Sequence, residues 1–370
     1  MRRSRSRRGA PATTESDGVL EETTQSEAPG SPDQATTPLV PVRNAVQTYA
    51  AQHPELGVAT QGYVDLVTSL LDEAGINYLS VTGRTKSVAS FAAKAVRQAE
   101  GRPAYTDPLT EITDQIGVRV ITYLRDDVDA VADLLSDQLT LLDDRDMGQE
   151  TAADGRWGYA SRHLLVTAGP EPDAAVDDHL HGRRASVQVR TVLQHAWAEF
   201  EHDIRYKGTI QDEHVPDLNR RFALAAGLLE LADREFSAIR DRVQATMTFR
   251  PAEPDAPAAG ISTQELTTFL AGKYTDAGWS RTDHYTWISG LLLELDITSV
   301  DDLDALLESV DNDAVQKLMG YRHPTGAVRR LDDALLSVFG RRYLDLEGNA
   351  HRTARLETRL QKLWASSPPT

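Results

Sequence analysis

The chain has 370 residues and carries 39 Lys plus Arg against 56 Asp plus Glu, which gives a formal net charge of −17. This acidic balance argues against broad binding to nucleic acid or an anionic membrane, because phosphate groups would be repelled on average. The absence of cysteine excludes disulfides, thiol catalysis and thiolate metal sites. No apolar run approaches the ~20 residues of a membrane span, so we expect a cytoplasmic protein without a membrane partner.

Residues 1–45 are rich in Ser, Thr, Pro and Ala and predict a disordered tail that begins with a run of arginines. Residues 46–247 show alternating helical and strand periodicity. The expected helices cover 63–71, 87–98, 127–139, 191–204 and 218–243, and the expected strands cover 78–82, 116–124, 163–167 and 185–189. This α/β pattern predicts a mixed β-sheet flanked by helices.

A second domain is expected after a Pro-rich linker at 248–261, because prolines rule out a helix interior there. Ser262 and Glu265 have the spacing of a capping box, which predicts the start of a helix. The pattern then predicts a separate all-α C-terminal domain over 262–347, of unknown role, and a C-terminal helix or tail over 348–370. This domain could mediate homo-oligomer formation, regulate the first domain or cover an apolar face of it.

Cations gather around the start of the predicted helix at 87–98. Arg84 and Lys86 precede it, where backbone amides favour anions, and Ser90 and Lys94 follow on one of its faces. Together they could hold a triphosphate, although a solvated helix start is the simpler reading. The chain has no Walker-type loop. Asp114, just before an apolar strand, is the natural Mg²⁺ ligand, or otherwise a turn residue.

Two further features bear on ligand binding. Tyr159 follows Gly158 in a turn-rich loop and could either stack on a purine or pack in a core. Glu199 and His202 have the i, i+3 spacing of di-metal helical bundles, but such a site needs a second pair on another helix and the sequence offers none.

Taken in order, these motifs resemble the RelA/SpoT-type alarmone synthetase family, which transfers pyrophosphate from ATP to the ribose 3′ hydroxyl of GDP or GTP. The resemblance runs from about residue 78 to 207 and is specific only in combination. The matching motifs are Arg-x-Lys-x-x-x-Ser-x-x-x-Lys from Arg84, Asp-x-x-Gly-x-Arg from Asp114, Gly-Tyr-x-Ser-x-His from Gly158, Gln-x-Arg-Thr from Gln188, and Trp-Ala-x-x-Glu-His from Trp197.

The resemblance implies a nucleotidyltransferase-like fold, a Mg²⁺ cofactor and a role in the stringent or stress response. It also implies a role for each matching residue. Arg84 and Arg119 would sandwich the adenine of ATP, while Lys86, Ser90 and Lys94 would bind its phosphates. Asp114 would hold Mg²⁺, Tyr159 would stack on guanine and His163 would lie near the acceptor nucleotide. Gln188 and Arg190 would lie on the strand that faces the reaction centre.

One position departs from the family pattern: Ser186 stands where the family usually has a glutamate that helps to activate the 3′ hydroxyl or bind metal. Serine is no general base at neutral pH without help. The enzyme could therefore be slow, use another carboxylate such as Glu199 or Glu201, or be a catalytically impaired nucleotide-binding regulator. A tRNA-directed pyrophosphokinase toxin is a further alternative, which the net charge of −17 disfavours. Ala160 also replaces a common arginine.

Overall fold

The computed structural model describes residues 39–99, 101–147, 161–168, 178–207, 214–246, 260–321 and 325–365. Most of the predicted tail, the loop that contains Tyr159 and Ala160, and most of the predicted linker therefore lie outside the described residues. Within the described part of the chain, no helix is both long and apolar enough to cross a membrane.

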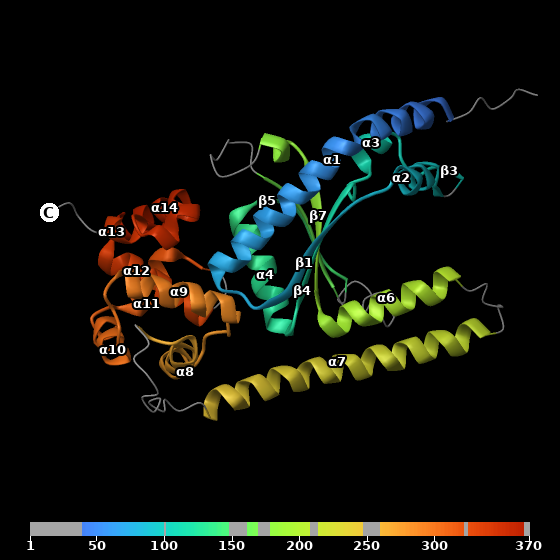
Figure 1. The fold of residues 1–370 in the computed structure, drawn as a ribbon. Coiled ribbons are helices and arrows are strands. Elements are labelled where there is room, and N and C mark those ends of the chain that lie inside the picture. Colours follow the sequence, from blue (N-terminus) through green and yellow to red (C-terminus); the bar gives the residue numbers. More distant parts are fainter. Residues whose placement is uncertain are drawn as a thin grey trace, which may run out of the picture.

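A five-stranded sheet in the order β1-β4-β7-β6-β5 forms the centre of the first domain (Figure 1). Its strands are β1 (Tyr78–Thr85), β4 (Ile116–Thr122), β5 (Thr140–Asp146), β6 (Arg162–Thr167) and β7 (Arg184–Thr191). β4 and β7 are parallel, and the other neighbours are antiparallel. β2 (Gln98–Ala99) and β3 (Arg102–Pro103) form a small separate hairpin. The expected mixed α/β architecture is thus confirmed.

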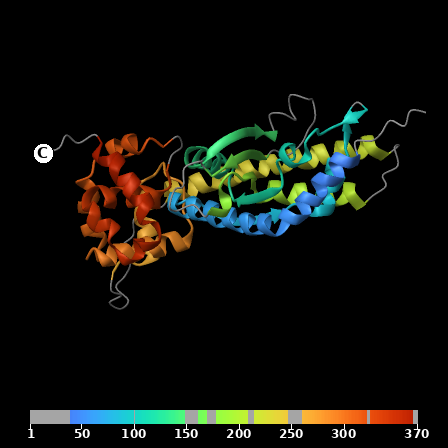
Figure 2. The ribbon, with the colours of Figure 1, turned by 90° about the horizontal axis from the view of Figure 1, so that it is seen from above.

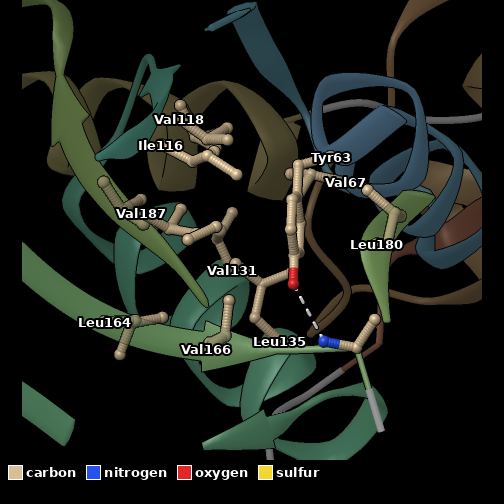
Figure 3. Close-up of a cluster of buried hydrophobic side chains, with 14 of the residues drawn as sticks. Tyr63, Val67, Ile116, Val118, Val131, Leu135, Leu164, Val166, Leu180 and Val187 are labelled. Carbon is tan, nitrogen blue, oxygen red and sulfur yellow. Dashed lines mark hydrogen bonds between the residues drawn. The ribbon is translucent and has the colours of Figure 1, made fainter. Parts of the chain in front are cut away.

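The apolar residues of the strands face α1 (Leu39–Ala74) and α4 (Arg125–Gln138). Figure 3 shows this core, where Tyr63 and Val67 of α1 and Val131 and Leu135 of α4 meet the side chains of β4, β6 and β7. Every second residue of β7 is buried, which is the period expected when a strand has one face in the core. The other side chains of the strand face away from α1 and α4.

The remaining helices of this domain are α2 (Val88–Ala95), α3 (Pro108–Glu111), η1 (Asp178–Leu180), α6 (Val192–Lys207) and α7 (Val215–Thr246). In Figure 1, α6 and α7 run side by side below the sheet. Trp197 of α6 and Phe222 of α7 pack edge to face, with ring centroids 6.5 Å apart. These two aromatic rings, with Ala226, form a small core of their own.

Besides the short elements β2, β3, α3 and η1, which the sequence did not predict, two larger elements differ from the sequence-based prediction. α1 begins at Leu39, inside the segment predicted to be disordered, because Ala45 and Tyr49 are spaced to pack on the sheet domain and are buried. β5 was not predicted. It is an edge strand whose charged run Asp143-Asp144-Arg145-Asp146 has low strand propensity, and it is held by pairing with β6.

The C-terminal helices form a second body at one end of the molecule (Figure 2). They are α8 (Thr263–Lys273), α9 (Thr282–Glu294), α10 (Val300–Glu308), α11 (Asn312–Met319), α12 (Ala327–Phe339), α13 (Arg341–Leu344), η3 (Glu347–Arg352) and α14 (Thr353–Trp364). The capping box of Ser262 and Glu265 is present at the start of α8. Leu356, Leu360 and Leu363 belong to the same core, so the segment from 348 onward packs with this body.

The end of α1 is where the helical body docks on the sheet domain. Asp72 Oδ1 lies 3.0 Å from His284 Nε2, and Glu73 Oε1 lies 2.8 Å from Arg355 Nη2. Ser280 Oγ donates a hydrogen bond of 2.5 Å to the carbonyl of Gly75. Gly75 has φ +66°, and a Cβ there would lie 2.9 Å from Ser280 Oγ, so both the turn and the close approach require glycine.

Tyr63→Phe tests how α1 is tied to the sheet. The Tyr63 hydroxyl donates to the carbonyl of Arg183 at 2.6 Å and accepts from the amide of Ala168 at 3.0 Å. Phenylalanine would leave both backbone groups without this partner, so we expect the free energy of unfolding to fall by about 1–3 kcal/mol. Urea denaturation measures it. Tyr123→Phe, at a residue that is 41% exposed, is the control. An equal loss of stability at both positions would contradict the role of the Tyr63 hydroxyl in holding α1 on the sheet.

Candidate active site

The strand register brings four of the predicted site residues to the sheet face that points away from α1 and α4. Arg119 of β4 is paired with Gln188 of β7, which is in turn paired with His163 of β6. In the neighbouring row, Ser186 lies between Gly117 and Leu165. Residues directly opposite one another on adjacent strands project to the same side. Arg119, Gln188, His163 and Ser186 therefore share one surface.

Arg84 joins this surface from β1, where it is paired with Gly117 and so lies in the same row as Ser186. Its side chain is exposed, and within the described residues it makes no ion pair. Gly83, just before it, lies tight against α1, because a Cβ there would be 2.7 Å from both Thr60 Cγ2 and Val64 Cγ2. The close contact between β1 and α1 fixes the strand that carries Arg84.

Lys86, Lys94 and Asp114 form a compact cluster beside this strand. Asp114 Oδ2 lies 2.9 Å from Lys86 Nζ, and Oδ1 lies 3.0 Å from Lys94 Nζ. Ser87 caps α2 as expected, since its hydroxyl accepts from the Ser90 amide at 3.2 Å, and this places Lys94 two turns into the helix. Two of the four residues expected to hold a triphosphate, Lys86 and Lys94, thus meet at one carboxylate.

The position and ionisation of Asp114 are both set by its neighbours. Gln115 Nε2 donates to the carbonyls of Leu109 and Ile112, at 2.6 and 3.0 Å, and this anchors the turn that carries Asp114. Burial by itself would raise the pKa of Asp114, but the hydrogen bonds and charges of Lys86 and Lys94 outweigh it and lower the pKa. Asp114 is therefore an anion at neutral pH.

His163 is held neutral in the middle of the face. Burial is the main cause that lowers its pKa to about 4, and the charges of Arg190 and Arg145 act in the same direction. Its Nε2 lies 2.9 Å from Ser161 Oγ, within hydrogen-bonding distance. A neutral imidazole of this kind can exchange hydrogen bonds with a nucleotide, but it adds no positive charge.

Glu199 reaches the same face from α6. Its Oε1 lies 2.9 Å from Arg119 Nη1 and 3.7 Å from His195 Nδ1. Burial first, and then the charge of Arg119, lower the pKa of Arg190, whereas the charge of Glu199 raises it. Glu199 is therefore a counter-charge for two arginines on neighbouring strands.

Some residues of this surface could not be predicted from the sequence, and one expected site residue is not described by the structure. Tyr159 lies outside the described residues, so its expected contact with a base stays a prediction. Arg145 was missed because β5 was not recognised, although the register pairs it with His163. The sequence does not determine the direction of the Glu199 side chain, because this depends on where α6 leaves β7.

Within the described residues, no three His, Asp or Glu side chains are grouped in a way that could hold a metal ion by themselves. Mg²⁺, however, is commonly bound by one or two carboxylates together with phosphate oxygens of a substrate. The side chain of Asp114 is 39% exposed beside two lysines, so it could supply that single carboxylate. The donor set fits Mg²⁺ only when phosphates complete it.

The part of the chain that carries these site residues is similar to known proteins. Residues 83–211 match the family model described as the region found in RelA / SpoT proteins. The chain is 33% identical to GTP pyrophosphokinase YjbM of Bacillus subtilis (strain 168) over 213 residues, which cover 56% of this chain and 88% of that protein. This chain belongs to the RelA/SpoT family. A second relative, GTP pyrophosphokinase YwaC of the same organism, is 27% identical over 163 residues, or 43% of this chain and 72% of that protein.

The chain is also similar to solved structures. Small alarmone synthetase 1 of Bacillus subtilis is 28% identical and covers 56% of this chain and 96% of its own, with a TM-score of 0.36. Small alarmone synthetase 2 of the same organism is 20% identical and covers 54% and 98%, with a TM-score of 0.40. The chain is a small alarmone synthetase-like member of the family, with a helical body added after the matched region.

Titration of His163 tests the electrostatics of the face. We expect its imidazole to titrate at about pH 4 in NMR spectra of the folded protein. In Arg145→Gln its pKa should rise, because one nearby positive charge is removed, but should stay below 6.5, because burial remains the larger cause. An ordinary pKa near 6.5 in the unaltered protein would contradict the arrangement.

Proposed function

We propose that the protein transfers the pyrophosphate group of ATP to the ribose 3′ hydroxyl of GDP or GTP and so makes the alarmone (p)ppGpp in a stress response. One observation carries the proposal. A lysine-carboxylate cluster suited to a triphosphate, formed by Lys86, Lys94 and Asp114, follows the end of β1 and lies next to the sheet face that carries Gln188 and His163. The names of the relatives YjbM and YwaC, both GTP pyrophosphokinases, support the same activity.

The donor side would use the cations next to β1 and α2. Lys86 and Lys94 would exchange part of their contact with Asp114 for contact with the phosphates of ATP. Arg84, which is exposed, and Arg119, which lies in the next row, would hold the adenine ring between their planar guanidinium groups. These contacts position the triphosphate and offset the charge that develops as the pyrophosphate is transferred.

Mg²⁺ belongs to the proposal as the group that neutralises phosphate charge when it is bound. Asp114 would hold it, since its carboxylate lies within 3.0 Å of both lysines that would face the phosphates. On the acceptor side, His163 and Gln188 offer hydrogen-bonding groups, and Arg190 adds positive charge on the same strand as Gln188. Tyr159 would stack on guanine.

The activity is tested with ATP labelled in its β and γ phosphates, incubated with GDP or GTP and Mg²⁺. We expect labelled ppGpp or pppGpp together with AMP, and no product when a chelator removes Mg²⁺. A parallel reaction contains tRNA instead of the guanine nucleotide. Label in tRNA and none in GDP or GTP would contradict the proposed acceptor.

Asp114→Asn tests the donor side. The neutral amide cannot balance the positive charges of Lys86 and Lys94, and it cannot hold Mg²⁺ as a carboxylate does. We therefore expect kcat/KM for ATP to fall by about 100-fold or more. The side chain of Asp114 is 39% exposed, and circular dichroism should therefore show a folded protein. Asp304→Asn removes a carboxylate paired with Lys273 in the helical body and serves as the control. Unchanged activity of Asp114→Asn would contradict the assigned site.

A further inference from the structure

The proposed reaction requires a group that accepts the proton of the acceptor hydroxyl, and position 186 offers none. A serine hydroxyl is not a base at neutral pH without help. The neighbours of Ser186 across the sheet are Gly117 on one side and Leu165 on the other, and neither can take a proton. A carboxylate that serves the acceptor must therefore come from another element.

Glu199 on α6 has the geometry of such a group. Its ion pair with Arg119 runs through Oε1, at 2.9 Å, and the same oxygen lies 3.7 Å from His195 Nδ1. Among the described residues, no hydrogen bond to its Oε2 occurs. The side chain is 54% exposed. A carboxylate that is oriented through one oxygen and accessible at the other is arranged as a base held by a third group.

The start of α6 fixes where Glu199 lies. Thr191 Oγ1 accepts from the amide of Gln194 at 3.1 Å, and Gln194 Oε1 accepts from the amide of Thr191 at 2.8 Å, which is a reciprocal cap at the end of β7. The Thr191 hydroxyl also donates to buried Asp233 of α7 at 2.9 Å. α6 thus leaves the sheet in a fixed direction, and Glu199 follows about 12 Å along it.

The other titratable groups of this face are less suitable. Asp143 of β5 pairs with Arg145 of its own strand and is separated from β7 by β6, which puts it about 10 Å across the sheet from Ser186. Asp114 is engaged by two lysines on the donor side. His163 is half-buried, with Nε2 close to Ser161, and its lowered pKa makes a proton on it costly.

We propose that Glu199, and not a residue of β7, is the catalytic carboxylate of the acceptor side. Its Oε2 accepts the proton of the ribose 3′ hydroxyl while that oxygen forms a bond to the β-phosphorus of ATP. The bond between this phosphorus and the oxygen that bridges to the α-phosphate breaks, and AMP leaves with the electron pair. The proton then passes from exposed Glu199 to water. This inference rests on the proposed function.

Glu199→Gln, measured with labelled ATP and GDP, tests it. We expect kcat to fall by about 100-fold or more, with the KM for ATP changed only a few-fold, because the amide can still accept a hydrogen bond from Arg119 but cannot take the proton. Ser186→Glu combined with Glu199→Gln should recover at least about tenfold of the lost kcat, because it returns a carboxylate to the neighbouring strand.

The control for Glu199→Gln is Glu230→Gln, which removes the charge of another helical glutamate paired with arginine, at 2.7 Å, but outside the site. It should leave kcat unchanged. Circular dichroism and the melting temperature establish that each variant is folded.

Each other outcome overturns one of the two proposals. If Glu199→Gln keeps full kcat, or raises only the KM for ATP, Glu199 merely orients Arg119 and the inference is wrong. If the unaltered protein is inactive but Ser186→Glu makes alarmone, the site can carry out the reaction and Glu199 is not its base. The inference about Glu199 is then wrong, while the proposed reaction class stands. If both of these proteins are inactive towards GDP and GTP, the proposed function itself is wrong.

Discussion

Repulsion between like charges is the constraint that shapes this site. Arg119 and Arg190 lie on adjacent parallel strands, and Lys86 and Lys94 approach the same carboxylate within 3.0 Å. Two anions make this possible without a bound nucleotide. Asp114 joins the lysines, and Glu199 faces the arginines. In the proposed complex, the phosphates of ATP would share with Asp114 the task of balancing the two lysines.

The two-residue period of the strands places the charged side chains of the site on one face of the sheet and the apolar core on the other. On β7, Val187 and Val189 are buried against α1 and α4, while Ser186, Gln188 and Arg190 alternate with them on the other side. A shift of the strand by one residue would exchange the two sets and bury the cations. The apolar core therefore determines the register, and the register determines which site residues are neighbours.

The sequence predicted the mixed sheet, most helices and the lysines around the start of α2, because periodicity and helix caps are local signals. Ser87, for example, marked the start of α2 and so the place of Lys94. It could not predict β5, whose charged residues conceal the strand, or the N-terminal half of α1, whose buried face depends on the sheet. The ion pair of Glu199 with Arg119 joins residues from a helix and a strand, so only the folded chain reveals it.

α1 is a single helix that contacts both the sheet domain and the C-terminal helical body. Its 36 residues extend about 54 Å, and its last turn is held by the helical body through Asp72, Glu73 and Gly75. Toward the other end, the hydroxyl of Tyr49 donates to the carbonyl of Lys86 at 2.6 Å. A rotation of the helical body would therefore be transmitted along one continuous helix to the backbone at Lys86.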